Sequence, residues 1–252
     1  MHEKHTCLSV MLFKAEEGDQ TEKMIDFMIK LQARYPQHNL TLQELPGSFS
    51  RGEGLKRGSE NYSNNALLVF MDVDMIFNRA FILRAKMNTI QYKQAYFPVV
   101  FSQFDPDTHC NDHPTLSPLQ CRQSLINNPY QYSEDVGYWR NFGFGIVAIY
   151  KSDFLYAGGF GKDRKSWGLE DVDLYESLLR HNLTVLRAPE PGLIHIYHVI
   201  DCDPNAPIEN YQSCLGTSSA TYGAHPRLAA MVLNDEKLLN KVVPYVPDPG
   251  KP

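Results

Sequence analysis

Two carboxylates, Asp72 and Asp74, interrupt the apolar stretch ALLVFMDVDMIF that begins at residue 66. An unpaired carboxylate is costly to bury, so acids in such a stretch need a partner or a neutralising ion. Side chains two apart on a strand share a face, so Asp72 and Asp74 can converge while Val73 points into the core. Such a pair at a strand end is typical of a Mg²⁺ or Mn²⁺ site. The alternative is a surface turn in which both acids accept backbone N–H groups.

A second group of acids opens the helical pattern SWGLEDVDLYESLL, and its members are Glu170, Asp171 and Asp173. Acids in a first helical turn complement the macrodipole, so all three can be explained as helix-terminal charges. That explanation does not account for Trp167 and Gly168, which precede them. An aromatic residue on a Gly-rich segment beside carboxylates is also typical of a lid that closes over a general base. Both interpretations stay open at this point.

Two histidines in GLIHIYHVIDCD are further candidate ligands. His195 and His198 are three residues apart, and on a regular strand they would face opposite sides of the sheet. Both can reach one ion only if the chain turns between them. A histidine joining Asp carboxylates suits Mn²⁺, which lies between hard and soft ions. The alternative is an ordinary hydrogen-bonded histidine.

These residues need a framework to position them, and the hydrophobic pattern predicts an α/β domain with a mostly parallel sheet. Strands are expected at 7–13, 39–45, 66–77, 95–104, 144–150, 183–188 and 192–200, and helices at 20–34, 79–92 and 171–182. The Gly-rich segment 46–65 is predicted to be a loop with one helical turn. In such sheets ligands bind beyond the carboxyl ends of strands, where Asp72 and Asp74 are expected.

Composition excludes some function classes. The 252 residues are 43% hydrophobic and carry a net charge of −5, which argues for a globular chain and against binding to nucleic acid. No apolar run approaches the roughly 18–20 residues that span a bilayer. The first residues are too polar for a signal peptide, so no membrane anchor is predicted within this chain.

Cysteines and glycosylation motifs bear on the compartment. Two local pairs are possible, Cys110 with Cys121 and Cys202 with Cys214, and the alternative is five reduced thiols. The motif Asn-x-Ser/Thr begins at Asn39, Asn61 and Asn182. Chance alone would supply about one or two such motifs, so they weakly favour a secreted or lumenal protein.

Taken in order, these motifs resemble the chondroitin N-acetylgalactosaminyltransferase family, within the wider β1,4-galactosyltransferase-like group. The resemblance covers residues 7–235 and is nearest to the C-terminal transferase domain of chondroitin synthases. The segments that carry it are FSRGEGLKRG, LLVFMDVDMIF, YFPVVFSQFDP, YWRNFGFGIVAIYKSDFLYAGGF, WGLEDVDLYESLL, HIYHVIDCDPN and YQSCLGTSSATYG. Any one of these segments is weak evidence, whereas the ordered set is highly specific.

The resemblance implies a Rossmann-like nucleotide-sugar transferase of the GT-A type, and it assigns roles to the motifs. An Asp-x-Asp motif in such enzymes holds Mn²⁺, or another divalent cation, against the donor diphosphate. Metal ligands are therefore expected at Asp74, His198 and His195, with His195 standing where the galactosyltransferases have Met. Asp171 is expected to be the catalytic base and Glu170 to hold the base or the acceptor. Expected donor-binding residues are Arg51, Asp72, Trp167 and Gly168.

The activity implied is inverting transfer of GalNAc from UDP-GalNAc to the terminal glucuronic acid of a growing chondroitin chain, through a β1,4 linkage. The acidic acceptor needs local positive charge, and the candidates are Lys162, Arg164 and Lys165. The resemblance also implies the Golgi lumen, a single-pass type II membrane protein in full length, and a related chondroitin synthase or polymerising-factor subunit as partner.

The whole of 1–252 is predicted to be one glycosyltransferase domain, with its core at 7–235 and a C-terminal tail at 241–252. Relative to the family pattern the chain lacks the first strand of the nucleotide fold, so it is expected to be a fragment. Two alternatives stay open: a non-catalytic polymerising partner or inactive truncated fragment, and a metal-dependent hydrolase that activates water.

Overall fold

The computed structural model describes residues 7–13, 21–47, 49–111, 113, 115–160, 169–205, 207–221, 223 and 233–234. The chain forms two compact units. One consists of Met1–Met71, Ala85–Phe97 and Gly143–Arg187, and the other of Asp72–Arg84, Pro98–Phe142 and Ala188–Pro252. Trp167, Gly168 and the predicted tail at 241–252 lie outside the described residues. No helix within the described part of the chain is both long and apolar enough to cross a membrane.

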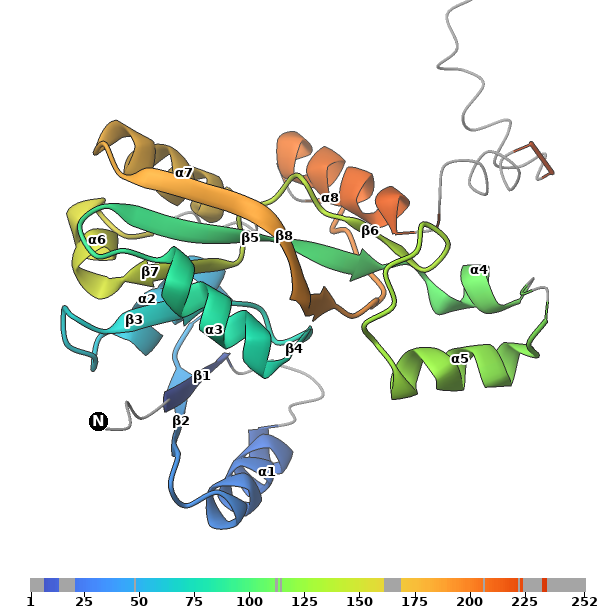
Figure 1. The fold of residues 1–252 in the computed structure, drawn as a ribbon, viewed down its shortest axis with the longest axis horizontal. Coiled ribbons are helices and arrows are strands. Elements are labelled where there is room, and N and C mark those ends of the chain that lie inside the picture. Colours follow the sequence, from blue (N-terminus) through green and yellow to red (C-terminus); the bar gives the residue numbers. More distant parts are fainter. Residues whose placement is uncertain are drawn as a thin grey trace, which may run out of the picture. The chain divides into compact units, whose positions relative to one another are not determined.

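The first unit begins with a β–α–β arrangement. Strand β1 (Cys7–Phe13) pairs in parallel with β2 (Asn39–Leu45), and helix α1 (Thr21–Arg34) lies between them in sequence. Parallel neighbours need such a crossover because the chain must return to the same end of the sheet before the next strand starts. These three elements match the predicted positions, and they form a two-stranded sheet of their own (Figure 1).

The core of the first unit is built on antiparallel strands. β3 (Leu67–Phe70) pairs with β7 (Val147–Tyr150), and β7 pairs with β5 (Gln94–Gln103) at Tyr96 and Ala148. Helices α6 (Lys151–Tyr156) and α7 (Glu170–Arg180) add apolar side chains to this core. Its fully or almost fully buried members include Phe97, Ile149, Phe154, Leu174 and Leu178.

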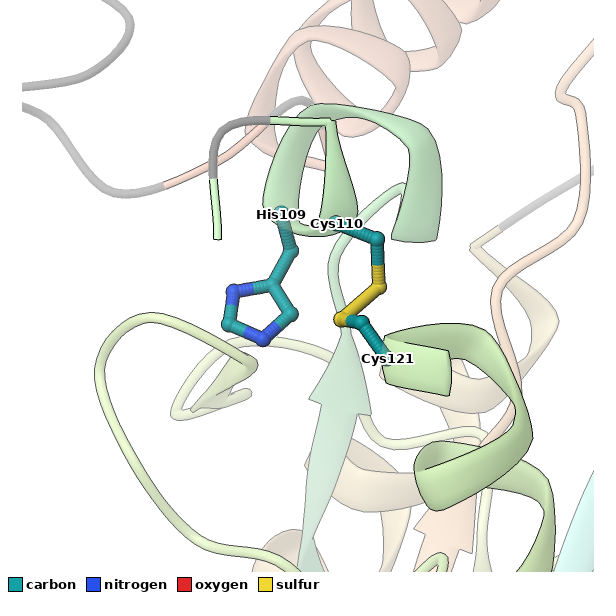
Figure 2. A group of neighbouring side chains, drawn as sticks. All are labelled: His109, Cys110 and Cys121. Atoms are coloured by element: carbon teal, nitrogen blue, oxygen red, sulfur yellow. A yellow bond between two sulfur atoms is a disulfide. The ribbon is translucent and has the colours of Figure 1, made fainter. Parts of the chain in front are cut away.

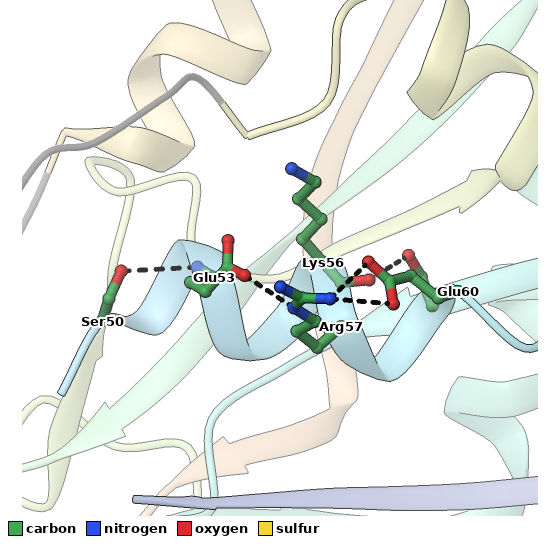
Figure 3. A network of polar contacts seen from close by, with 6 residues as sticks. Ser50, Glu53, Lys56, Arg57 and Glu60 are labelled. Atoms are coloured by element: carbon green, nitrogen blue, oxygen red, sulfur yellow. Dashed lines mark hydrogen bonds and ion pairs between the residues drawn. The ribbon is translucent and has the colours of Figure 1, made fainter. Parts of the chain in front are cut away.

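Helix α2 (Arg51–Ser59) replaces the predicted loop in the Gly-rich segment, so that prediction is wrong in extent. The Ser50 side chain caps the helix by accepting the N–H of Glu53. The Arg57 guanidinium then donates to Glu53 at 2.7 Å and lies 3.4 Å from Glu60 (Figure 3). Lys56 extends away from this chain of ion pairs. Local interactions thus offset the low helix propensity of the glycines.

The second unit contains β4 (Met75–Phe77), which pairs antiparallel with β8 (Thr184–His195). β6 (Gly137–Trp139) pairs antiparallel with the end of β5. At Gly137 a Cβ atom would lie 2.3 Å from the carbonyl oxygen of Ser102, so this pairing requires glycine. Helix α3 (Arg79–Asn88) follows β4 in sequence, and a cluster of Phe101, Val136 and Ile194 forms part of the core.

Helices α4 (Pro106–Cys110), α5 (Pro118–Asn127) and α8 (Ile208–Ala220) complete the second unit. The structure forms both predicted disulfides, Cys110–Cys121 and Cys202–Cys214. The remaining cysteine, Cys7, is a free thiol. Each disulfide closes a short loop next to a helix, which fixes polar segments that bury few apolar side chains.

The predicted α/β class is confirmed, but the larger sheet is mixed and not mostly parallel. Its strand order is β3-β7-β5-β8-β4, with β6 on β5. The four pairings described above, β3 with β7, β7 with β5, β4 with β8 and β6 with β5, are all antiparallel. The hydrophobic pattern identifies strands without giving their direction, which explains the error. β8 also runs as one strand through Pro189 and Pro191, where two strands were expected. Both prolines precede the residues that pair with β4.

Candidate functional site

One candidate site, in the second unit, is centred on the Asp74 carboxylate. Its Oδ2 atom lies 2.9 Å from Nε2 of His198 and 3.3 Å from Nε2 of His195. One ligand atom from each of the three residues can be chosen so that all lie within 4.8 Å of one another. Asp74 and His195 are partly buried, and His198 is exposed. The structure therefore brings together the three residues predicted to bind metal.

Strand register explains why these residues meet. Met75 pairs with His195 at the start of β4, and the N–H of Ile196 donates to the Asp74 carbonyl at 3.0 Å. Asp74 is thus held directly opposite the end of β8. Beyond His195 the chain leaves the strand, so the usual opposition of residues three apart does not apply to His198. Both imidazoles therefore reach the same carboxylate, as a shared ion would require.

The protonation of His198 is informative. Its Nδ1 atom lies 3.0 Å from the carbonyl oxygen of Val199, which can only accept, so Nδ1 carries a proton. In the neutral ring Nε2 then presents a lone pair toward the Asp74 carboxylate. A lone pair and a carboxylate repel each other, so an approach this close is favourable only with a proton on Nε2 or a cation between the two groups. A metal ligand whose second nitrogen donates to a carbonyl is a common arrangement.

Asp74 also has unused bonding capacity. Within the described residues, its Oδ1 atom and Nδ1 of His195 are buried and have no hydrogen-bond partner. Burial raises the pKa of Asp74, but the hydrogen bond and charge of His195, the backbone and the charge of His198 outweigh it. The pKa therefore lies below the ordinary value. An ionised carboxylate, two imidazoles and buried atoms without partners fit a divalent cation.

The rest of the Asp-x-Asp motif lies in a turn and not on a strand. β3 ends at Phe70, and residues 73 and 74 form a turn before β4. Val73 is 96% exposed, so the prediction that it points into the core is wrong. Strand alternation does not apply in a turn, and Asp72 is not among the three residues that cluster. Of the two acids that the sequence predicts to converge on one ion, the cluster contains only Asp74.

A second cluster in the same unit has a different explanation. His109 lies beside Cys110 and Cys121, and the three could in principle hold a metal (Figure 2). Here the two sulfur atoms form a disulfide, which leaves no thiolate to bind an ion. This cluster is therefore a structural crosslink with a neighbouring histidine.

The other candidate site, in the first unit, lies at the start of α7. Arg51 of α2 donates to Glu170 Oε1 at 3.1 Å, and its second terminal nitrogen donates to the carbonyl of Gly145. The side chains of Arg51 and Glu170 are only 15% and 12% exposed. Gly52 packs beside them, where a Cβ would lie 3.3 Å from Cβ of Phe160. Glu170 is thus fixed by a partly buried ion pair.

Asp171 is held by the backbone on both of its oxygens. Oδ2 accepts the N–H of Phe144 at 3.1 Å, and Oδ1 accepts the N–H of Val172 at 2.9 Å. These contacts orient the carboxylate while leaving lone pairs for a further proton donor. The helix itself begins after Leu169, which has φ 75° and supplies no side-chain cap. Glu170 binds Arg51, and Asp171 binds Phe144 as well as an N–H of its own first turn, so helix capping alone does not account for these two acids.

Three residues around Asp171 were missed from the sequence. Phe144 stacks on Tyr175, with ring centroids 4.2 Å apart, and the Arg187 guanidinium lies 4.3 Å from the Phe144 centroid. Tyr175 follows Asp171 by four residues on a helix, a spacing that places both on one face and that offered a usable signal. Phe144 and Arg187 lie in strand-like segments without such a signal. The expected basic residues, Lys162, Arg164 and Lys165, lie outside the described residues, as do Trp167 and Gly168.

Comparison with known proteins gives a consistent result. Residues 1–228 match the family described as chondroitin N-acetylgalactosaminyltransferase. The chain is 40% identical over 227 residues to chondroitin sulfate synthase 3 of Mus musculus, covering 90% of this chain and 24% of that protein. It is 36% identical over 230 residues to chondroitin sulfate N-acetylgalactosaminyltransferase 1 of Homo sapiens, covering 91% of this chain and 41% of that one. The chain thus spans between a quarter and about two fifths of these relatives.

Among solved structures, the mannosyltransferase PcManGT of Pyrobaculum calidifontis, in complex with GDP-Man and Mn²⁺, matches with a TM-score of 0.48 and 13% identity. The match covers 94% of this chain and 74% of that one. A similarity of this size says nothing about the activity of the present chain.

Proposed function

Because the chain belongs to the chondroitin N-acetylgalactosaminyltransferase family, we propose that it is a metal-dependent, inverting hexosyltransferase of the GT-A type. Its donor is UDP-GalNAc, and its acceptor is the C4 hydroxyl of the terminal glucuronic acid of a growing chondroitin chain. The product is a β1,4 linkage. The structural observation that supports metal dependence most directly is the Asp74 carboxylate, which has an imidazole nitrogen of each of two histidines against one oxygen.

Asp74, His195 and His198 would hold the divalent cation, which we propose to be Mn²⁺. When bound, such an ion neutralises the negative charge that develops on a leaving diphosphate. Asp72 is assigned to the nucleotide side of the donor. Like Asp74 it follows strand β3, but it is not among the three clustered residues. Arg51 is assigned to the donor as well, and its pairing with Glu170 keeps both side chains in fixed positions. Trp167 and Gly168 keep their predicted role in closing over the donor.

Asp171 is the proposed general base. Its carboxylate takes the proton of the acceptor hydroxyl while that oxygen bonds to the anomeric carbon of GalNAc. The bond from the anomeric carbon to the diphosphate breaks on the opposite face and UDP leaves, so an α-linked donor gives a β-linked product. The N–H groups of Phe144 and Val172 orient the carboxylate for this transfer. Glu170 positions the first turn of α7 through Arg51.

We further propose that the protein acts in the Golgi lumen, as part of a type II membrane protein that works with a related chondroitin synthase or polymerising subunit. Two disulfides support an oxidising compartment. The three asparagines that begin glycosylation motifs, Asn39, Asn61 and Asn182, are exposed, as modification requires.

The test is calorimetric titration of UDP-GalNAc into the purified chain, with Mn²⁺ and with chelator, beside Asp74→Ala. We expect binding with Mn²⁺ only, and at least about a tenfold loss in the variant, since even residues that merely orient metal ligands contribute that much. Asp26→Ala is the matched control, because Asp26 is an exposed acid paired with Lys30 on α1. UDP-Gal and UDP-GlcNAc titrated in the same way test the choice of donor.

A folded chain that binds no UDP-sugar under any condition would sink the enzymatic proposal and favour a non-catalytic partner role. Metal-independent binding would leave a transferase without the proposed ion. Circular dichroism of each variant separates loss of ligand from loss of fold.

A further inference from the structure

The chemistry of the proposed acceptor sets a requirement near the base. In glucuronic acid the carboxylate is attached to C5, the ring carbon next to C4, which bears the reacting hydroxyl. Any group that takes the proton from that hydroxyl therefore lies within one sugar ring of the acceptor carboxylate. Asp171 is itself an anion, and two like charges so close repel each other. A cation must sit beside Asp171 for this acceptor to bind.

Arg187 lies in that place among the described residues. Its guanidinium donates to the carbonyl of Gly143 at 3.2 Å and lies over the ring of Phe144. The next backbone N–H, that of Phe144, donates to Asp171. Base and cation therefore contact the same dipeptide, Gly143–Phe144, within one compact unit.

The surroundings of Arg187 suit a carboxylate. Partial burial lowers the pKa of Arg187 although the charge of Asp171 opposes it, so a further anion beside the guanidinium would offset the cost of burial. A guanidinium presents its N–H donors in a planar fork, and that fork matches the two oxygens of a carboxylate. The ring of Phe144 stacks on Tyr175, and its centroid lies 4.3 Å from the guanidinium carbon, so a cation–π contact helps to hold Arg187 in place.

We propose that Arg187 binds the carboxylate of the glucuronic acid acceptor and makes the site selective for an acidic sugar. This inference rests on the proposed function and extends it to a named specificity residue. The basic residues that the sequence suggested for this role, Lys162, Arg164 and Lys165, lie outside the described residues and stay a prediction. Arg187 takes no part in proton transfer, so its loss is expected to affect acceptor binding far more than turnover.

The test compares two acceptors, a chondroitin oligosaccharide that ends in glucuronic acid and the same oligosaccharide with that carboxyl reduced, which ends in glucose. The chain should bind the first more tightly by about 10- to 100-fold, the usual range for hydrogen bonds to a charged group. Arg187→Gln should remove this preference by weakening only the acidic acceptor. Arg187→Lys, which keeps the charge but loses the fork, should fall between the two.

Arg180→Gln is the matched control, because Arg180 is an exposed arginine of the same unit that pairs with Glu176. It should keep the full preference. The inference is overturned if Arg187→Gln still prefers glucuronic acid. It is also overturned if the variant loses affinity for both acceptors equally, a result that would indicate a packing role for Arg187. If Arg187→Gln does not fold, Arg187→Lys decides alone, because an unchanged preference there also overturns it.

Binding and transfer are measured separately so that the two proposals can fail separately. If GalNAc is not transferred but the Arg187-dependent preference is present, the proposed function fails and the acidic-sugar site stands. If transfer occurs with KM and kcat for the acidic acceptor unchanged in Arg187→Gln, the inference fails alone.

Discussion

At the scale of single residues, the proposed base Asp171 is oriented by hydrogen bonds from backbone N–H groups. Both oxygens of Asp171 accept a backbone N–H, one from its own helix and one from Phe144. Backbone donors are rigid, so the carboxylate keeps its direction whether or not an acceptor sugar is bound. Such positioning is what a general base requires before its pKa becomes relevant.

Asp171→Asn should reduce kcat for GalNAc transfer by about 10²- to 10⁴-fold, because an amide cannot take a proton. The amide oxygen also accepts only one of the two backbone N–H groups that the carboxylate accepts. Metal-dependent binding of UDP-GalNAc should remain within about twofold of the wild-type value on the same argument. Steady-state kinetics and titration of the same preparations provide the two measurements.

Glu176→Gln is the control for Asp171→Asn, since it removes an exposed carboxylate from the same helix. A fully active Asp171→Asn variant would remove Asp171 from the proposed mechanism.

Sequence analysis located the residues of the metal cluster better than it described their surroundings. The motifs predicted Asp74, His195 and His198 as metal ligands, and the structure brings these three residues together where β8 ends. Val73 was placed in the core because one strand was predicted over 66–77, whereas β3 ends at Phe70 and β4 begins at Met75. Sequence analysis had no means of finding Arg187, since a single arginine in a strand has no periodic or spacing signal.

At the scale of elements, α2 shows how tertiary contacts use glycine. Gly52 lies where a Cβ would meet Cβ of Phe160 at 3.3 Å, whereas at Gly58 the nearest atom is the flexible Met11 side chain at 3.5 Å. One glycine is thus required by packing and the other is not.

Gly58→Ala should stabilise the protein by about 0.5–1 kcal/mol, because alanine restricts the unfolded chain and favours helix. Gly52→Ala should give no such gain, because the Cβ of Phe160 sits close to the backbone and has little freedom to move. Urea unfolding of both variants tests the contrast. Equal stabilisation by the two substitutions would contradict the packing argument.

The order of elements was predictable, whereas two features of their arrangement were not. Alternating strands and helices such as β1, α1 and β2 follow from hydrophobic spacing. Strand direction and the continuity of β8 depend on contacts distant in sequence, which a local pattern does not contain. The helical state of the Gly-rich α2 likewise comes from its cap, its ion pairs and its packing.

At the scale of the whole molecule, four of the five cysteines are committed to disulfides whose partners are 11 and 12 residues apart. Short loops of this kind lower the entropy of the unfolded chain without needing a large core. Both lie in one unit, where α4, α5 and α8 are joined by polar segments.

The double variant Cys202→Ser with Cys214→Ser should lower the free energy of unfolding by about 2–4 kcal/mol. Cys7→Ser is the control and should change little, because this thiol is free and only partly buried. Urea unfolding without reductant gives both values. Equal stability of the double variant and the wild type would mean that the Cys202–Cys214 bond does not form.

The glycine at the start of β6 has a consequence for the inheritance of this gene. Every missense change at codon 137 adds at least one carbon where the carbonyl oxygen of Ser102 is 2.3 Å away and the Phe101 ring is 2.6 Å away. No rotamer relieves that overlap, since the clash is with the first side-chain atom. The protein made from any such allele should lose the β5–β6 pairing, however small the new side chain.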